Sequence, residues 1–212
     1  METTNNIDGS GLIEQLNCAF ATTEIVDLVQ TLAINKIKIA IAPLIQMLHH
    51  HNPSVSAAAV TGLVQLTPDS VEALITAFHA CKDHGVQAYI VQALAQISDA
   101  RGLDILIEVV GTEVANHCQG NVRRVAARGL GKIGKINHLE IRQEAISPRG
   151  LHKVITKLTW ALLKPQDWAL RYAAVVSLEK IATEATISSL KEALNQEIDQ
   201  VVQLRIQTAL GN

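Results

Sequence analysis

The chain has 212 residues, of which 48% are hydrophobic and 3% aromatic, and its formal net charge is −2. This composition excludes a disordered chain, and the excess of Ala, Leu, Ile and Val over aromatic residues favours packed helices over a sandwich of strands. Charged or strongly polar residues interrupt every apolar stretch, so no membrane span is expected. Residues 1–9 lack a basic region and an apolar core, so no secretion signal is predicted.

The three cysteines are widely spaced. Cys18, Cys81 and Cys118 form no CxxC pair, so the sequence predicts neither a disulfide framework nor a zinc site. Reduced thiols are typical of the cytoplasm, which is the expected location. Cys18 and Cys81 lie within apolar helical segments, and we expect both to be buried small hydrophobic residues.

Charge is distributed unevenly along the chain. Residues 1–120 carry 4 basic and 12 acidic side chains, whereas residues 121–212 carry 14 and 8, which gives net charges of −8 and +6. The densest basic stretch runs from Arg123 to Lys157 and is either a solvated helix face or a surface that attracts phosphates, carboxylates or an acidic protein. Nucleic acid is not an expected partner, because the basic residues are not interleaved with aromatic ones.

A five-residue pattern, whose first occurrence is Gly-Leu-Val-Gln-Leu at 62–66, recurs with variation at the end of successive segments that have helical periodicity. Its leucines are 31, 36, 48 and 32 residues apart, so the basal period is near 31–32 residues and two intervals contain insertions. We expect insertions near 111–120 and 135–150. The pattern occurs at 62–66, 93–97, 129–133 and 177–181, and it begins again at 209–211.

A second helical segment, indicated by the spacing of its aliphatic residues, precedes each of these patterns. These segments centre on 44–48, 74–78, 106–110 and 190–194, and good helix-start residues stand between the segments at Pro53, Asp69, Asp99 and Asp167. One such pair cannot bury its own apolar stripe, whereas stacked pairs share a continuous core. The sequence therefore predicts an all-α solenoid of stacked helix pairs over residues 10–212, after a loose N-terminus at 1–9.

The start of the second helices carries a family resemblance. Val122-Arg123 and Leu170-Arg171 occupy early positions and are followed by Ala-rich sequence. In this the chain resembles the HEAT-repeat family. The resemblance implies a right-handed superhelix with the second helices on its concave side, and it implies no particular chemistry.

The first insertion carries the residues best suited to chemistry. We expect a loop at 116–120 that leads into a helix at 121–133, capped by Asn121. The helix start and the arginines that follow would favour the thiolate of Cys118, and His117 can give or take a proton near neutral pH. The two residues are therefore an acid–base pair, a nucleophile with a proton carrier, or part of an ordinary polar loop.

The hexapeptide NHCQGN at 116–121, placed between HEAT-like helices, resembles the F-type subunits of the phycoerythrocyanin alpha-chain bilin lyase-isomerases. The resemblance implies a heterodimer with an E-type subunit. It also implies attachment of phycocyanobilin to a cysteine of the apo-phycoerythrocyanin alpha subunit and isomerisation of the pigment to phycoviolobilin. His117 and Cys118 would take part in the isomerisation. The alternatives are a phycocyanin-type lyase subunit without isomerase activity and a non-catalytic HEAT scaffold that binds a protein.

The same resemblance suggests residues that contact the substrate, since the bilin is a substrate and no permanently bound cofactor is expected. Polar side chains would bind its lactam and pyrrole groups, and arginines would bind its two propionates unless they pair with neighbouring repeats. Aromatic rings would stack on the tetrapyrrole or serve packing alone. The candidates are Asn116, Gln119 and Asn121, then Arg123, Arg124, Arg128 and Arg171, and finally Trp168 and Tyr172, with Trp160 on the preceding helix.

Other motifs carry no function. The run His49-His50-His51 ends a predicted helix, and adjacent residues point in different directions, so no metal site is expected there. The chain contains no His-Glu dipeptide of the kind used by di-iron HEAT hydroxylases, and it contains no phosphate-binding glycine motif.

Overall fold

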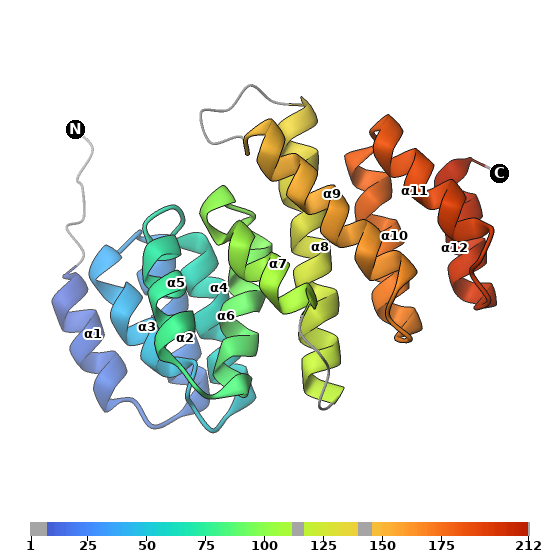
Figure 1. Cartoon of the computed structure of the whole chain (residues 1–212). Helices are drawn as coiled ribbons and strands as arrows, with labels where there is room; N and C mark the ends of the chain where they lie inside the picture. Colours follow the sequence, from blue (N-terminus) through green and yellow to red (C-terminus); the bar gives the residue numbers. More distant parts are fainter. Residues whose placement is uncertain (1–7, 112–116, 140–145, 212) are drawn as a thin grey trace. The chain divides into compact units, whose positions relative to one another are not determined.

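Repeated helices account for the architecture (Figure 1). The computed structural model describes residues 8–111, 117–139 and 146–211, and of residues 117–119 and 136–139 it describes the backbone alone. Within these ranges there are α-helices, two short 3-10 helices and no strand. The helices are α1 Gly9–Cys18, α2 Thr22–Ile34, η1 Lys38–Ala40, α3 Ile41–Met47, α4 Pro53–Gln65, α5 Ser70–Ala80, α6 His84–Ile97, η2 Ala100–Gly102, α7 Leu103–Gly111, α8 His117–Leu139, α9 Pro148–Leu163, α10 Trp168–Ile181, α11 Glu184–Leu194 and α12 Gln200–Leu210.

The chain forms two compact units, Met1–Ala93 and Leu94–Asn212. In the first unit α4 packs on both α2 and α3, around fully buried residues that include Val29, Leu44 and Leu63. In the second unit α8 packs on α7, α9 and α10, and α10 also contacts α12. The predicted pairing of helices and the all-α HEAT-like fold are confirmed, whereas an unbroken array over residues 10–212 stays a prediction.

Helix starts follow the predicted chemistry. Asn52 caps α4 through the Ser54 N–H, with Pro53 in the first turn. Asp69 stands at the N-cap of α5 without a side-chain cap bond. Asp99 caps η2 through Arg101, and Asp167 caps α10. A side-chain oxygen at the N-cap satisfies backbone N–H groups that have no partner inside the helix.

Two local expectations are wrong. Helix α8 begins at His117 and not at Asn121, so residues 117–120 form its first turn and Asn121 is no cap. Gly120 does not stop the helix, because a helical glycine costs only about 1 kcal/mol relative to alanine and the long packed remainder of α8 outweighs it. Cys18 is exposed and Cys81 is half-buried, since they lie at the ends of α1 and α5, away from the core-facing positions.

One position has the same structural role in five second helices. It lies seven residues before the repeat leucine, directly after a Val or Leu, and its side chain donates to carbonyls that close the preceding helix or turn. Gln87 Nε2 donates to Cys81 O at 2.9 Å, and Arg123 Nε donates to Val110 O at 3.0 Å. The full set is Ser56, Gln87, Arg123, Arg171 and Gln203. Because serine and glutamine suffice, this role requires a donor and not a charge.

The repeat leucine of α8 lies between two glycines that allow close helix packing. A Cβ atom added to Gly131 would lie 2.6 Å from Ser177 Cβ and 2.7 Å from Ser177 Cα. A Cβ atom at Gly129 would meet Ala95 at 2.7 Å. Helices α8 and α10 therefore approach each other more closely than a larger residue would permit.

Gly131→Ala is expected to destabilise the protein. Overpacking costs about 1–3 kcal/mol, and the upper part of this range, about 2–3 kcal/mol, applies because the added Cβ would meet the Ser177 backbone. The better helix propensity of alanine returns about 1 kcal/mol, which leaves a net loss of about 1–2 kcal/mol. Urea unfolding followed by circular dichroism measures this loss. Lys132→Ala, at the exposed neighbouring position, serves as the control and should change stability by less than about 0.5 kcal/mol. An unchanged midpoint for Gly131→Ala would show that the two helices can separate at no cost.

Candidate functional site

The predicted catalytic residues lie at the start of α8. The backbone of His117, Cys118 and Gln119 forms part of its first turn, while their side chains lie outside the described residues, as does the whole of Asn116. Asn121 follows on the exposed side of the same helix. The roles of these five residues stay predictions. The structure adds that the motif itself forms a helix N-terminus, with N–H groups that have no partner inside the helix and a positive dipole end.

Arg123 lies one and a half turns further along α8 and is only 6% exposed. Its Nε donates to Val110 O at the end of α7, and its Cζ lies 6.0 Å from the ring centroid of Trp160 on α9. Burial lowers the pKa of Arg123, and the negative charge of Asp167 opposes that shift. A guanidinium group nevertheless stays charged at neutral pH, so Arg123 is a buried cation.

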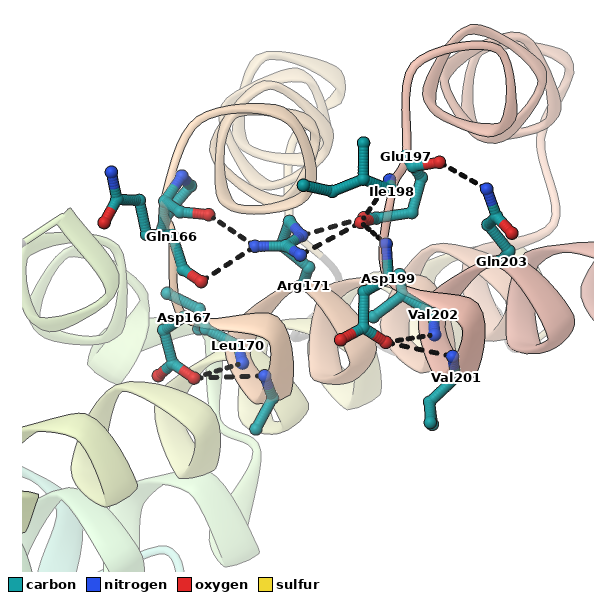
Figure 2. A network of polar contacts seen from close by, with 12 residues as sticks. Gln166, Asp167, Leu170, Arg171, Glu197, Ile198, Asp199, Val201, Val202 and Gln203 are labelled. Atoms are coloured by element: carbon teal, nitrogen blue, oxygen red, sulfur yellow. Dashed lines mark hydrogen bonds and ion pairs between the residues drawn. The ribbon is translucent and has the colours of Figure 1, made fainter.

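Arg124 and Arg171 have carboxylate partners within the chain. Arg124 donates from Nε and Nη2 to Asp167 at 3.1–3.2 Å, which ties α8 to the start of α10. Arg171 donates to both Glu197 oxygens at 2.8 and 2.9 Å and to the carbonyls of Pro165 and Gln166 (Figure 2). These contacts favour the structural alternative for both arginines, and a role in binding substrate stays a prediction.

Glu197 is held by more than Arg171. Its Oε1 also accepts from the backbone N–H groups of Ile198 and Asp199, at 3.0 and 2.9 Å (Figure 2). Burial would raise the pKa of Glu197, but the hydrogen bonds from Arg171 and from these N–H groups, together with the Arg171 charge, outweigh burial and lower it. The pair is well buried, with side chains 12% and 4% exposed, and it anchors the turn before α12 to α10.

The remaining candidates differ in exposure. Arg128 is exposed on α8, and Trp168 is 50% exposed at the first position of α10, so each is open to a ligand. Tyr172, one turn after Trp168, is half-buried. The sequence marks Lys157 only as the end of the basic stretch, whereas the structure places its Nζ 5.0 Å from the Trp160 centroid. The i, i+3 spacing of these two residues on a helix was the signal that could have identified the contact.

Asp167 has two roles, and their combined loss is expected to exceed the loss of a cap alone. It accepts from the N–H groups of Ala169 and Leu170, and it pairs with Arg124. Asp199 offers a matched comparison, because it caps α12 through Val201 and Val202 in the same way. Asp199→Ala should cost about 1 kcal/mol, and Asp167→Ala about 1.5–2 kcal/mol, since a partly exposed ion pair contributes up to about 1 kcal/mol. Equal losses in urea unfolding would show that the Arg124 pair contributes nothing.

Within the described ranges no group of three or more His, Cys, Asp or Glu side chains is placed to hold a metal ion. Over the same ranges, the helices are too short or too polar to cross a bilayer. The rings of His50 and His51 stack on each other at 4.3 Å.

Comparison with known proteins identifies both the fold and the family of this chain. The family model of HEAT repeats matches residues 41–117 and 112–211, so this is a HEAT-repeat protein. The bilin biosynthesis protein PecF of Mastigocladus laminosus is 50% identical over 203 residues, which cover 94% of this chain and 92% of that protein. The phycocyanobilin lyase subunit beta of Nostoc sp. (strain PCC 7120 / SAG 25.82 / UTEX 2576) is 33% identical over 200 residues, or 92% of this chain and 95% of that one.

A solved structure agrees with these relatives. The complex of CpcE and CpcF of phycocyanin lyase from Nostoc sp. PCC7120 contains a chain that matches with a TM-score of 0.66 and 32% sequence identity. The match covers 81% of this chain and 98% of that chain. The chain therefore belongs to the F-type subunits of the bilin lyase family, the group that includes PecF.

Proposed function

We propose that this chain is the F-type subunit of a heterodimeric bilin lyase-isomerase. The enzyme attaches phycocyanobilin to a cysteine of the apo-phycoerythrocyanin alpha subunit and isomerises the pigment to phycoviolobilin. The 50% identity to PecF over 94% of the chain carries this proposal. The complex of the similar lyase chain with CpcE supports an E-type partner for this chain as well. The site of action is the cytoplasm of a phycobilisome-containing cell.

The reaction needs proton transfer and no net redox change. In ligation, the sulfur of the acceptor cysteine adds to the ethylidene group on ring A of the pigment, and the thiol proton ends on carbon. In isomerisation, one carbon of the conjugated system loses a proton and another gains one, so a double bond moves. The acceptor cysteine belongs to the apo-protein and not to this chain, and the bilin is a substrate and not a resident cofactor.

His117 and Cys118 are the proposed isomerisation residues. His117 shuttles the proton, and Cys118 either adds transiently to the bilin or serves as the second proton carrier. Transient addition interrupts conjugation and eases migration of the double bond. The position of both residues in the first turn of α8 supports this assignment, because a helix N-terminus stabilises a thiolate. Asn116, Gln119 and Asn121 hydrogen-bond the lactam and pyrrole groups.

Reconstitution tests the proposal against its alternatives. Phycocyanobilin is incubated with this chain, its cognate E-type partner and the apo-alpha subunit, and the absorption spectrum of the protein-bound pigment is recorded. A violobilin spectrum is expected. A cyanobilin adduct alone would make the chain a lyase subunit without isomerase activity, and the absence of covalent pigment would leave a HEAT scaffold that binds a protein.

A further inference from the structure

Two cations meet at one aromatic ring in the second unit. Arg123 from α8 and Lys157 from α9 both lie against Trp160, with Cζ at 6.0 Å and Nζ at 5.0 Å from its ring centroid. Both side chains also lie close to the C-terminal end of α7. Arg123 donates to Val110 O, and Lys157 Nζ lies only 2.8 Å from the point where a Cβ on Gly111 would stand. The cations are therefore fixed between three helices.

The hydrogen bond that Arg123 makes in its repeat does not require a charge. Gln87 holds the equivalent position in α6 and donates to Phe78 O and Cys81 O without any charge. Arg123 makes one hydrogen bond, through Nε, within the described part of the chain. The charge of Asp167 acts on it from a distance, but Asp167 forms its ion pair with Arg124, and no ion pair joins Arg123 to a described carboxylate. Its Nη groups, which form the outer edge of the guanidinium fork, therefore keep their donors available although the residue is only 6% exposed.

Neighbouring basic residues show the contrast. Arg124, next in the sequence, has Asp167, and Arg171, at the equivalent position of α10, has Glu197. Lys153, one turn before Lys157 on α9, pairs with Asp104 at 3.3 Å. Lys157 has no such partner among the described residues. A buried or half-buried cation without an ion-pair partner in contact is costly, so this pair of residues favours an anion supplied from outside the chain.

We propose that Arg123 and Lys157 bind a propionate carboxylate of the bilin, with Trp160 as the wall that holds both cations in place. The free Nη edge of Arg123 suits the two oxygens of a carboxylate, and Lys157 adds a second charge-assisted hydrogen bond. Arg123 is 6% exposed, so only a group on a narrow arm can reach it. A glutamate side chain has the same two-carbon arm as a propionate, so the bilin is chosen because the proposed function brings it to this chain, and a protein contact is an outcome of the test. The inference rests on the proposed function, and it selects Arg123 from the four candidate arginines.

The test measures bilin binding and not turnover. The full chain is co-purified with its E-type partner, and phycocyanobilin is titrated into the complex with absorbance as the readout. Arg123→Gln is chosen because Gln87 shows that glutamine can cap the preceding helix at this position, so the variant should fold. With Lys157→Gln as the second variant, each is expected to raise the Kd for phycocyanobilin about tenfold. Lys153→Gln, which removes a cation already paired on the same helix, should leave the Kd unchanged.

A second probe identifies the group that is recognised. The dimethyl ester of phycocyanobilin lacks both carboxylates, so it should bind the unmodified complex about tenfold more weakly and should not distinguish that complex from the two variants. An equal loss of ester and acid binding in the variants would overturn the carboxylate contact.

Two further outcomes separate this site from the proposed function. If the unmodified complex binds phycocyanobilin and both variants bind it equally well, the site is wrong while the proposed function stands. If the variants instead weaken association with the E-type partner in size-exclusion chromatography and leave the bilin Kd unchanged, the cations serve a protein contact and the site is again wrong. If the unmodified complex binds no bilin, the proposed function fails and the site fails with it.

Discussion

His117→Ala should abolish violobilin formation while attachment of phycocyanobilin continues. A positioned acid–base group contributes about 10²–10⁴-fold to a proton transfer, so the rate of double-bond migration should fall by that factor. Ligation transfers its proton from the acceptor thiol and needs a different geometry. The expected product is therefore a cyanobilin adduct, which the absorption spectrum of the denatured alpha subunit distinguishes from a violobilin adduct.

Cys118 calls for two substitutions, because its two proposed roles differ in what serine can replace. If Cys118 adds to the bilin, Cys118→Ser should be as inactive in isomerisation as Cys118→Ala, since an alcohol is a much poorer nucleophile than a thiolate. If Cys118 only carries a proton, serine should retain part of the rate. Lys132→Ala, exposed on the same helix, is the control for general damage to α8 and should form violobilin normally. Violobilin formation by both the His117 and Cys118 alanine variants would place isomerisation elsewhere.

Much of the fold could be predicted because the sequence signals for helices and repeats are local and periodic. The repeat leucines mark buried positions, as Leu63, Leu94, Leu130 and Leu178 show, and Asp99 and Asp167 mark helix starts. Each of these signals depends on residues within about one helical turn of each other. The extent of α8 was missed for the opposite reason. Helix α8 packs on α7, α9 and α10, and such contacts between distant segments favour a longer helix than the local preferences of Gly120 and Asn121 predict.

The site was predicted less completely, because the partners of its charged residues lie far apart in the sequence. Arg124 meets Asp167, 43 residues away, and Arg171 meets Glu197, 26 residues away. Periodicity shows that two residues occupy equivalent positions, but it does not show which of them lacks a counter-ion. Arg123 and Arg171 look identical in the repeat pattern and differ because only the repeat after Arg171 supplies a buried glutamate. Only the three-dimensional structure shows that difference.

The Arg171–Glu197 pair gives the largest expected effect on stability. Removal of one partner of a buried ion pair costs about 3–5 kcal/mol, because it leaves the other charge uncompensated. Arg171 would keep its bonds to two carbonyls, so Glu197→Ala should lie near the lower end, at about 3 kcal/mol. Urea unfolding followed by circular dichroism measures the loss. Glu192→Ala, exposed on α11, is the control and should change stability by less than about 0.5 kcal/mol.

The double variant Arg171→Gln/Glu197→Gln tests whether charge or hydrogen bonding sustains the turn before α12. Gln87 and Gln203 occupy the same repeat position as Arg171 and donate to carbonyls without a counter-ion. The double variant should therefore be less destabilised than the sum of the two single variants, because neither partner is left as an isolated charge. Strictly additive losses would mean that the two residues do not act as a pair.

The unfolding free energy measured at acidic pH provides an independent test of the same contact. The pKa of Glu197 in the folded chain is lowered from 4.5, so the unfolded chain binds the proton more readily. The stability that this group contributes is present above about pH 4.5 and is lost as the pH falls through the lower pKa of the folded state. Glu197→Gln removes the titrating group, so the unfolding free energy of this variant should fall less steeply than that of the unmodified chain below pH 4.5. Parallel curves would mean that the carboxylate gains nothing from Arg171 and the two N–H groups, and the buried pair could then not be what anchors the turn to α10.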